Sequence, residues 1–304
     1  MKQRKLGNSN LFVSELGLGC MSVGTDEIYA RRIIETALEE GINYFDTADL
    51  YDMGENETIV GKALKNVREQ VIIATKVGNR WKPDQSGWTW DPSKTYIKEA
   101  VKDSLKRLGT DYIDLYQLHG GTILDPIDEV IEAFEELKTE GFIRYYGISS
   151  IRPNVIREYI AKSGLVSVMM QYSMLDRRPE EKVLPQLHEH GISVVTRGPL
   201  AKGLLSDKMV EKLAAGKGYL DYSFEELSEV LPHLKEVVAG VRSFTEVALQ
   251  YNLANPVVAS VVAGASSPEQ VRENAKAIKS QPLTNEEVSL IKQVTKANTY
   301  QEHR

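Results

Sequence analysis

The stretch YFDTADLYDMGENE, residues 44–57, begins as an apolar strand and becomes polar after two residues. Asp46, Thr47 and Asp49 end the apolar run, and Tyr51 follows directly before a turn that contains glycine. A strand that only fills a core does not need carboxyl groups and a phenol at its end. The segment therefore predicts a strand whose end carries side chains with a catalytic or binding role.

Short apolar runs rich in β-branched residues recur along the chain, and each is followed by a stretch with helical spacing of its apolar residues. The runs are almost continuously apolar, as parallel strands covered on both faces are. Eight alternations of strand and helix favour a closed (β/α)8 TIM barrel over an open doubly wound sheet. The expected strands are 14–22, 42–48, 71–77, 112–119, 142–149, 166–173, 192–198 and 257–264, and the expected helices lie near 26–40, 56–66, 93–107, 126–140, 153–162, 180–190, 234–253 and 268–279.

Two additions lie outside the eight units. Residues 1–13 contain a turn sequence and predict an N-terminal β-hairpin that closes the bottom of the barrel. Residues 284–297 predict an extra C-terminal helix, with Thr284 as N-cap and Glu287 completing a capping box. Long loops at 78–92 and 205–224, the second with a helix-like insert, are expected over the active-site face because each follows a strand.

Composition limits the classes of function. The 304 residues contain no long Ser/Gly/Pro linker, so a single domain over 1–304 is expected. A net charge of −6 without any basic block argues against a nucleic-acid partner. The single cysteine, Cys20, cannot form an internal disulfide, and no apolar run approaches the roughly 20 residues of a spanning helix. The start of the chain is a poor signal peptide, so a cytoplasmic location without membrane contact is expected.

Four polar residues lie at the carboxyl ends of three successive expected strands: Asp46, Tyr51, Lys76 and His119. Each has an ordinary structural explanation, as an N-cap, a core aromatic, a snorkelling lysine or a core imidazole. In a barrel, however, the carboxyl ends of the strands meet at one rim. An acid, a phenol, an ammonium and an imidazole would then converge there.

This set of groups suits the delivery of a proton to a carbonyl oxygen. A tyrosine has an ordinary pKa near 10, and it exchanges a proton at neutral pH more readily when a cation favours its phenolate. Lys76 could supply that cation, and Asp46 would keep Lys76 charged. Tyr51 is therefore the expected general acid, worth roughly 10² to 10⁴ in rate, and His119 would orient the carbonyl.

With these residues in place, the sequence resembles the aldo-keto reductase family over nearly the whole chain. GINYFDTA (residues 41–48) followed by Tyr51 resembles the family's first signature, and Lys76 and His119 stand where its Lys and His belong. The resemblance implies a barrel without a Rossmann domain that binds NADP(H) in extended form. It further implies metal-free reduction of aldehydes and ketones, with hydride leaving the A face of the nicotinamide.

The resemblance also implies a cofactor site. Ser149 and Gln171 would hold the nicotinamide carboxamide, and Ser150 replaces the family's usual Asn. Residues 198–203 resemble the loop that wraps the pyrophosphate, where backbone amides suit an anion. Arg197 stands where many relatives carry an aromatic residue that stacks on the nicotinamide.

Residues 264–274 resemble the segment that grips the adenosine 2′-phosphate. Gly264 and Gln270 replace the frequent Lys and Arg, and a neutral Gln cannot match the charge-assisted bonds of Arg to phosphate. NADP(H) is the expected cofactor, with NAD(H) possible. The cofactor-binding residues implied are Met21, Asp46, Ser149, Gln171, Arg197, Gly198, Leu200, Lys202, Gly203, Gly264, Ser266, Gln270, Glu273 and Asn274.

The expected substrate is a small carbonyl compound held by Tyr51 and His119. All tryptophans of the chain lie in the loop after the third strand, and Trp81 and Trp88 would form an aromatic wall over the carbonyl. Alternatively, the loop packs around its own rings. Met21 could add apolar lining.

Two other functions remain open from the sequence. A barrel lysine can form a Schiff base, so Lys76 could be the nucleophile of an aldolase-type lyase. Asp46 argues against this, because it would keep the amine protonated. A barrel that carries the nucleotide only as a sensor is the second possibility. The oligomeric state, monomer or small homo-oligomer, also stays open.

Overall fold

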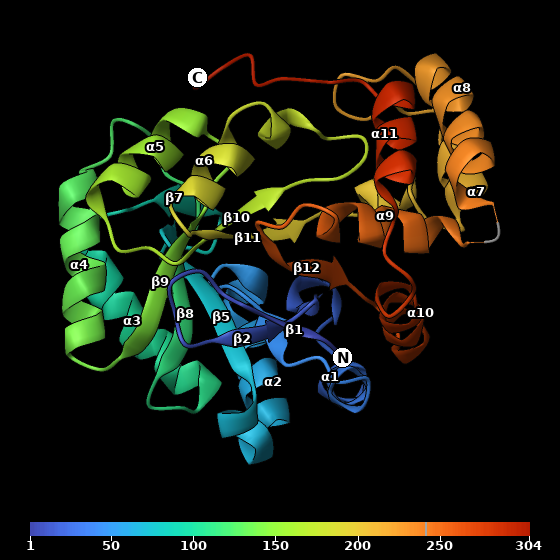
Figure 1. Ribbon diagram of the computed structural model, residues 1–304. Helices are drawn as coiled ribbons and strands as arrows, with labels where there is room; N and C mark the ends of the chain where they lie inside the picture. The colour runs from blue at the N-terminus through green and yellow to red at the C-terminus, as the bar shows by residue number, and fades with distance from the viewer. Residues whose placement is uncertain (241) are drawn as a thin grey trace.

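The computed structural model describes residues 1–240 and 242–304. Eight parallel strands close into a barrel in which each strand pairs with its neighbours along the chain. Figure 1 shows the helices arranged around these strands. The predicted (β/α)8 TIM barrel is confirmed. The barrel strands are β3 (Leu16–Gly19), β4 (Tyr44–Asp46), β5 (Ile72–Val77), β8 (Ile113–Leu118), β9 (Ile143–Ser149), β10 (Ser167–Gln171), β11 (Ser193–Arg197) and β12 (Val258–Gly264).

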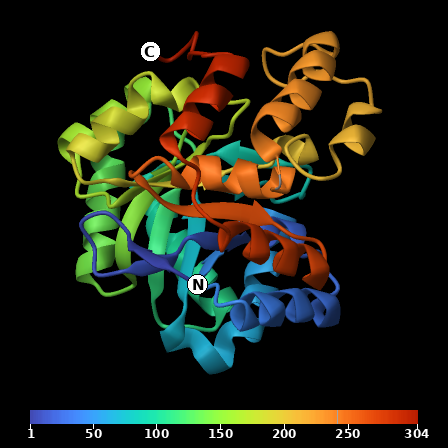
Figure 2. The ribbon, with the colours of Figure 1, turned by 45° about the vertical axis from the view of Figure 1, so that its right-hand side comes forward.

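The surrounding helices lie around the barrel (Figure 2). Each buries one apolar face against it, as the sequence spacing predicted. In the first of them, Ile33 and Ile34 are fully buried, whereas Arg31 and Glu35 form an exposed ion pair. The Asp26 side chain caps the start of this helix by accepting bonds from two backbone N–H groups. These helices are α1 (Glu27–Glu39), α2 (Glu55–Leu64), α3 (Lys94–Leu108), α4 (Ile127–Thr139), α5 (Pro153–Lys162), α6 (Val183–Glu189), α9 (Phe244–Leu253) and α10 (Pro268–Ile278).

The expected helix at 234–253 is wrong as a single element. Helix α8 (Phe224–Leu234) continues into a short π-helical stretch (Lys235–Ala239), and α9 begins separately at Phe244. Ser223 and Ser243 each begin a capping box, which starts a new helix at each position. The sequences SFEE and SFTE carried this signal. A short helix, α7 (Met209–Leu213), occupies the insert expected within 205–224.

The predicted N-terminal hairpin closes one end of the barrel. Strands β1 (Gln3–Lys5) and β2 (Phe12–Ser14) pair antiparallel and lie across the barrel end in Figure 1. Leu6, Leu11 and Val13 are buried in the apolar cluster that fills the barrel interior. Gly7 has φ +52°, and a Cβ there would lie 2.1 Å from the Val166 carbonyl oxygen. Only glycine fits this close approach.

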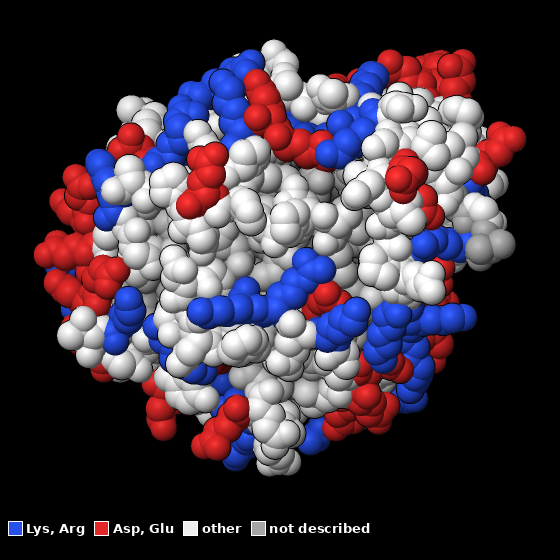
Figure 3. Space-filling view, in the orientation of Figure 1, with Lys and Arg blue, Asp and Glu red and all other residues white. Residues whose placement is uncertain are grey.

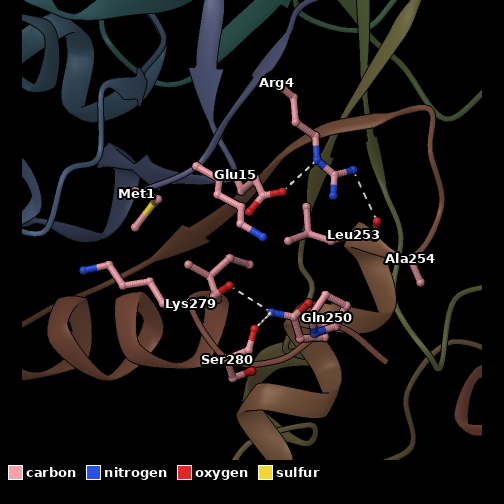
Figure 4. A pocket seen from close by; sticks show the side chains of 11 residues that line it. Met1, Arg4, Glu15, Gln250, Leu253, Ala254, Lys279 and Ser280 are labelled. Carbon is pink, nitrogen blue, oxygen red and sulfur yellow. Dashed lines mark hydrogen bonds and ion pairs between the residues drawn. The ribbon is translucent and has the colours of Figure 1, made fainter. Parts of the chain in front are cut away.

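Polar side chains fasten the hairpin to the barrel. Arg4 Nε donates to Glu15 Oε1 at 2.9 Å, and its Nη1 donates to the carbonyls of Leu253 and Val258 at 3.2 and 3.0 Å. Gln250 Nε2 donates to carbonyls at the end of α10. Figure 4 shows Arg4 and Gln250 beside a cavity of about 470 Å³ at this end. The polar groups of both side chains stabilise the fold, because each forms hydrogen bonds to other groups of this chain.

The surface of this barrel end is mixed in charge. Figure 3 shows a row of Lys and Arg side chains across the middle of the face, over the hairpin, with acidic side chains around it. Basic side chains in the described part of the chain are paired with carboxylates in several places, including Arg144 with Asp114 and Lys279 with Glu40. The face therefore presents no broad field of one sign.

The extra C-terminal helix is confirmed as α11 (Asn285–Val294), with Thr284 and Glu287 forming the predicted capping box. Beyond it the chain returns toward α5, where the backbone N–H of Asn154 donates to the His303 carbonyl at 2.8 Å. Within the described residues, no helix has the length and apolar character needed to cross a membrane.

Candidate active site

A cavity of about 420 Å³ opens at the carboxyl ends of the barrel strands. Tyr51, Lys76 and His119 all line it, although they come from segments that follow or end three different strands. Its complete lining is Met21, Leu50, Tyr51, Lys76, His119, Gly120, Ser149, Ser150, Ile151, Arg152, Met169 and Arg197. The predicted convergence at one rim is what the structure shows.

Lys76 lies at the centre of this arrangement. It is the fifth residue of the fully buried strand β5, and its side chain is only 1% exposed. Its Nζ donates to Asp46 Oδ2 at 2.6 Å, to the Thr47 carbonyl at 2.7 Å and to Tyr51 Oη at 3.3 Å. An ammonium group has three protons to donate, so these contacts use all of them.

Asp46 lies at the end of β4 and is 4% exposed. Its second carboxylate oxygen is 3.5 Å from Gln117 Nε2, which donates from β8. The sequence analysis missed Gln117. Its signal was a polar residue inside an apolar strand, two positions before His119 and therefore on the same face.

The proton equilibria of Lys76 and Tyr51 follow from burial and from their contacts. Burial alone would lower the pKa of Lys76, but the Asp46 carboxylate and the Tyr51 hydroxyl outweigh it and raise that pKa. Burial raises the pKa of Tyr51, and the Lys76 ammonium only partly opposes this. Lys76 therefore favours the phenolate as expected of a neighbouring cation, but burial has the larger effect on the pKa of Tyr51. Tyr51 holds its proton, as a general acid must before it reacts.

His119 follows β8, and its backbone N–H donates to the Val77 carbonyl at 2.7 Å. Its ring meets the Tyr51 ring edge-on, with centroids 5.9 Å apart at 85°. Burial lowers the pKa of His119 to about 3, helped by the positive charges of Lys76 and Arg197. The buried Nδ1 has no hydrogen-bond partner among the described residues. The ring is therefore neutral, with an unused polar atom.

The two residues expected to hold the carboxamide, Ser149 and Gln171, differ in how far their side chains are available to a ligand. Ser149 ends β9 and lines the cavity. The Gln171 amide is already engaged, since its Nε2 donates to Asp176 and to Tyr219 and its Oε1 accepts from Arg197 Nη1 at 3.0 Å. The structure thus fixes Gln171 and brings the guanidinium of Arg197 to the cavity.

The expected phosphate-binding segments lie on neighbouring parts of the rim. Residues 198–203 follow β11 and residues 264–274 begin at the end of β12, and these two strands pair in parallel. Gly198 and Gly203 have positive φ angles of 67° and 92°. Lys202 is exposed between them.

The side chains of the second segment are partly committed to local contacts. Gln270 Oε1 accepts from the backbone N–H of Ser266 at 2.8 Å, at the start of α10. Arg272 is about half exposed and lies 3.8 Å from Glu39, as expected for a solvated helix face. Glu273 is also exposed, and Asn274 is buried.

The tryptophan loop is more regular than expected. It contains a hairpin of β6 (Asn79–Trp81) and β7 (Trp88–Trp90), in which Trp81 and Trp88 are paired opposite each other. Trp88 is 50% exposed, and neither ring lines the cavity. Trp90 packs against Gly78 and donates from Nε1 to Asp125 at 3.0 Å. The loop thus packs around its own rings, and the substrate contacts of Trp81 and Trp88 stay a prediction.

The cavity also contains residues that the sequence analysis did not assign. Ile151 and Arg152 lie between β9 and α5, and Met169 comes from β10. The signal for Arg152 was a charged residue three positions after Ser149, at the carboxyl end of a predicted strand.

Comparison with known proteins agrees with this geometry. Residues 15–296 match the model of the "Aldo/keto reductase family". The chain is 60% identical to the oxidoreductase YqkF of Bacillus subtilis (strain 168), with 100% of both sequences covered. It is 33% identical to the "NADH-specific methylglyoxal reductase" of Escherichia coli (strain K12), covering 98% of this chain and 99% of the relative.

A solved structure gives the same result. The holo form of aldo-keto reductase AKR11C1 from Bacillus halodurans superposes with a TM-score of 0.95 at 62% sequence identity, covering 100% of this chain and 99% of that chain. The barrel, the residues at its rim and the matches over the full length lead to one conclusion: this chain belongs to the aldo/keto reductase family of oxidoreductases.

Proposed function

We propose that this protein reduces small aldehydes and ketones to alcohols with a reduced nicotinamide nucleotide. The observation that carries the proposal is the contact of the Lys76 ammonium with both Asp46 and Tyr51 at the wall of a cavity. A protonated phenol beside an amine that a carboxylate holds in its charged form is suited to give a proton to a substrate oxygen.

The roles of the residues follow from their contacts. The Tyr51 hydroxyl donates its proton to the carbonyl oxygen, and Lys76 stabilises the phenolate that remains. Asp46 holds Lys76 in its charged form. When bound, the reduced nicotinamide supplies the hydride, so the carbonyl gains one hydride and one proton and becomes an alcohol. Tyr51 then regains a proton from water.

His119 orients the substrate in this proposal. Burial keeps its ring neutral, and a neutral imidazole has one N–H that it can donate to the carbonyl oxygen. The edge-on contact with Tyr51 keeps both groups on the same side of the cavity. The two side chains would therefore bind the same oxygen atom.

NADPH is the proposed cofactor, with only weak discrimination against NADH. Arg197, Lys202 and the glycine-containing turn between them suit a diphosphate. Gln270, however, is neutral and engaged with Ser266, so it offers little to a 2′-phosphate. One relative is an NADH-specific enzyme by name. The proposed contacts remain Met21, Asp46, Ser149, Gln171, Arg197, Gly198, Leu200, Lys202, Gly203, Gly264, Ser266, Gln270, Glu273 and Asn274.

The remaining expectations from composition complete the proposal. A single domain over 1–304 is proposed because no long linker divides the chain, and a nucleic-acid partner is not proposed because the net charge is −6 without a basic block. A cytoplasmic location is proposed because the single cysteine, Cys20, suits a reducing compartment.

Cofactor binding and turnover can be tested in sequence. NADPH and NADH are titrated by their fluorescence, and the tighter ligand is then used with a panel of aldehydes. We expect saturable binding and cofactor-dependent loss of the aldehyde. Tight binding without any turnover would instead favour a sensor.

The lyase alternative has its own test. A Schiff base requires an unprotonated amine, whereas Lys76 is protonated and donates to Asp46, Thr47 and Tyr51. Borohydride should therefore trap no substrate adduct. An adduct located on Lys76 by mass spectrometry would defeat the reductase mechanism.

A further inference from the structure

The cavity contains a cation that the reaction described above does not use. Arg152 lies just after β9 and occupies the N-cap position of α5. It lines the same cavity as Tyr51 and His119. With Ile151 it also lines a neighbouring cavity of about 690 Å³ beneath the C-terminal tail, so it stands where the two spaces adjoin.

The guanidinium of Arg152 has few partners. Its Nη1 donates to the Gly121 carbonyl, which fixes the direction of the side chain. Within residues 1–240 and 242–304, no carboxylate lies within 4.0 Å of it, although Asp221 and Glu302 line the neighbouring cavity. A guanidinium has five N–H donors in a planar fork. Most of its donor capacity is therefore unused.

The charges around the cavity do not cancel. Lys76 is neutralised by Asp46, and His119 is neutral because burial keeps its pKa far below 7. Among the described residues that line the cavity there is no Asp or Glu. Arg197 donates to Gln171 and belongs to the proposed cofactor contacts. Arg152 is then an uncompensated positive charge on the substrate side.

We propose that the substrate is a carbonyl compound that also carries a carboxylate, and that Arg152 binds this carboxylate. The inference rests on the proposed reductase function. An arginine fork matches a carboxylate with two parallel hydrogen bonds. Leu50, Ile151 and Met169 supply an apolar lining for the hydrocarbon between the two groups. The carbonyl would lie at Tyr51 and His119, and the carboxylate at Arg152.

The test compares two aldehydes of nearly equal size, 4-formylbenzoate and its neutral methyl ester. We expect the unmodified protein to have the higher kcat/KM for the acid. Arg152→Gln should reduce this preference by roughly tenfold to a hundredfold, mainly through KM, because a charge-assisted pair is lost. Arg152→Lys should keep part of the preference. Added salt should weaken the preference of the unmodified protein.

Arg31→Gln is the matched control. It removes the same charge, but Arg31 lies on the outer face of α1, exposed and paired with Glu35. Its preference for the acid should equal that of the unmodified protein. Thermal melting of all variants checks that they fold.

Each outcome decides between the two proposals. Equal kcat/KM values for the two aldehydes in the unmodified protein would overturn the role of Arg152 while the reductase function stands. The same holds if Arg152→Gln lowers both values equally, since that is a structural effect. If neither aldehyde is reduced with either nucleotide, the proposed function fails, and the substrate class proposed here fails with it.

Discussion

Two arginines at opposite ends of the same barrel show how differently the two ends are built. Arg4 at the closed end meets one carboxylate and two backbone carbonyls. Arg152 at the open end meets a single carbonyl and no carboxylate within the described residues. Arg4 therefore bonds to groups of the fold, whereas Arg152 keeps N–H donors available to another molecule.

The difference extends to the neighbours of each arginine. At the closed end, the amide of Asn43 exchanges hydrogen bonds with the β2 strand, and Gln250 is spent on carbonyls of α10. At the open end, His119 Nδ1 is buried without a partner in the described part of the chain. Buried polar atoms normally find partners, and this one belongs to a ring that lines the cavity beside Tyr51, where a ligand could meet it. Substitutions at the two ends should therefore have opposite profiles.

The largest expected effect is on turnover at the open end. Tyr51→Phe removes the proton donor but keeps the ring that meets His119. We expect kcat to fall by roughly 10² to 10⁴. NADPH affinity and the melting temperature should change little, as fluorescence titration and thermal melting would show. Unchanged kcat would remove Tyr51 from the mechanism.

Lys76→Met should reduce both activity and stability, because it leaves Asp46 buried and unpaired. Breaking one side of a buried ion pair costs about 3–5 kcal/mol. The double variant with Asp46→Asn removes the stranded charge and should recover part of the loss in urea unfolding, without recovering kcat. A double variant no more stable than Lys76→Met would contradict the buried pair.

At the closed end, Arg4→Met should lower the stability and leave the turnover nearly unchanged. It removes the bonds to Glu15, Leu253 and Val258 while keeping an apolar stem. We expect a loss of about 1–3 kcal/mol in the free energy of unfolding. The kcat should stay within a factor of about two. A large fall in kcat at full stability would mean that the two ends are coupled.

The smallest expected effect concerns Asp49, a buried carboxyl beside the open end to which no described side chain donates a hydrogen bond. Burial and the nearby Glu57 raise the pKa of Asp49 to about 8, against the pull of Arg107. The folded state therefore keeps a proton that the unfolded state loses. The stabilisation is fully present below about pH 4 and is lost as the pH rises through 8.

Asp49→Asn cannot ionise, so it should remove the loss of stability that the unmodified protein shows between about pH 4 and pH 8. At pH 8.5 the variant should melt higher than the unmodified protein, by the equivalent of about 1 kcal/mol, because the new amide also lacks partners. Below about pH 4 this advantage of the variant should disappear, because the carboxyl is then protonated in both the folded and the unfolded state. Parallel melting curves across this range would show that Asp49 is ionised throughout.

Much of the fold could be predicted because it depends on local patterns. The apolar runs and the helical spacing located all eight barrel strands and most of the helices. The break before α9 was missed although Ser243 and Glu246 signalled it, since apolar spacing alone cannot distinguish one helix from two in succession. The hairpin within 78–92 was also missed, because its pairing depends on contacts between the two strands.

The sequence alone determined which chemical groups gather at the rim, because a barrel brings the ends of its strands together whatever their distance along the chain. It could not determine how those groups are charged or which partners they have. Burial outweighs the effect of Lys76 on the pKa of Tyr51, and it leaves His119 neutral. Only the tertiary structure decided these points, since pKa values and free donors depend on the atoms that pack around a group. In the described part of the chain, the same packing gave Arg152 a backbone carbonyl and no carboxylate beside the reacting groups.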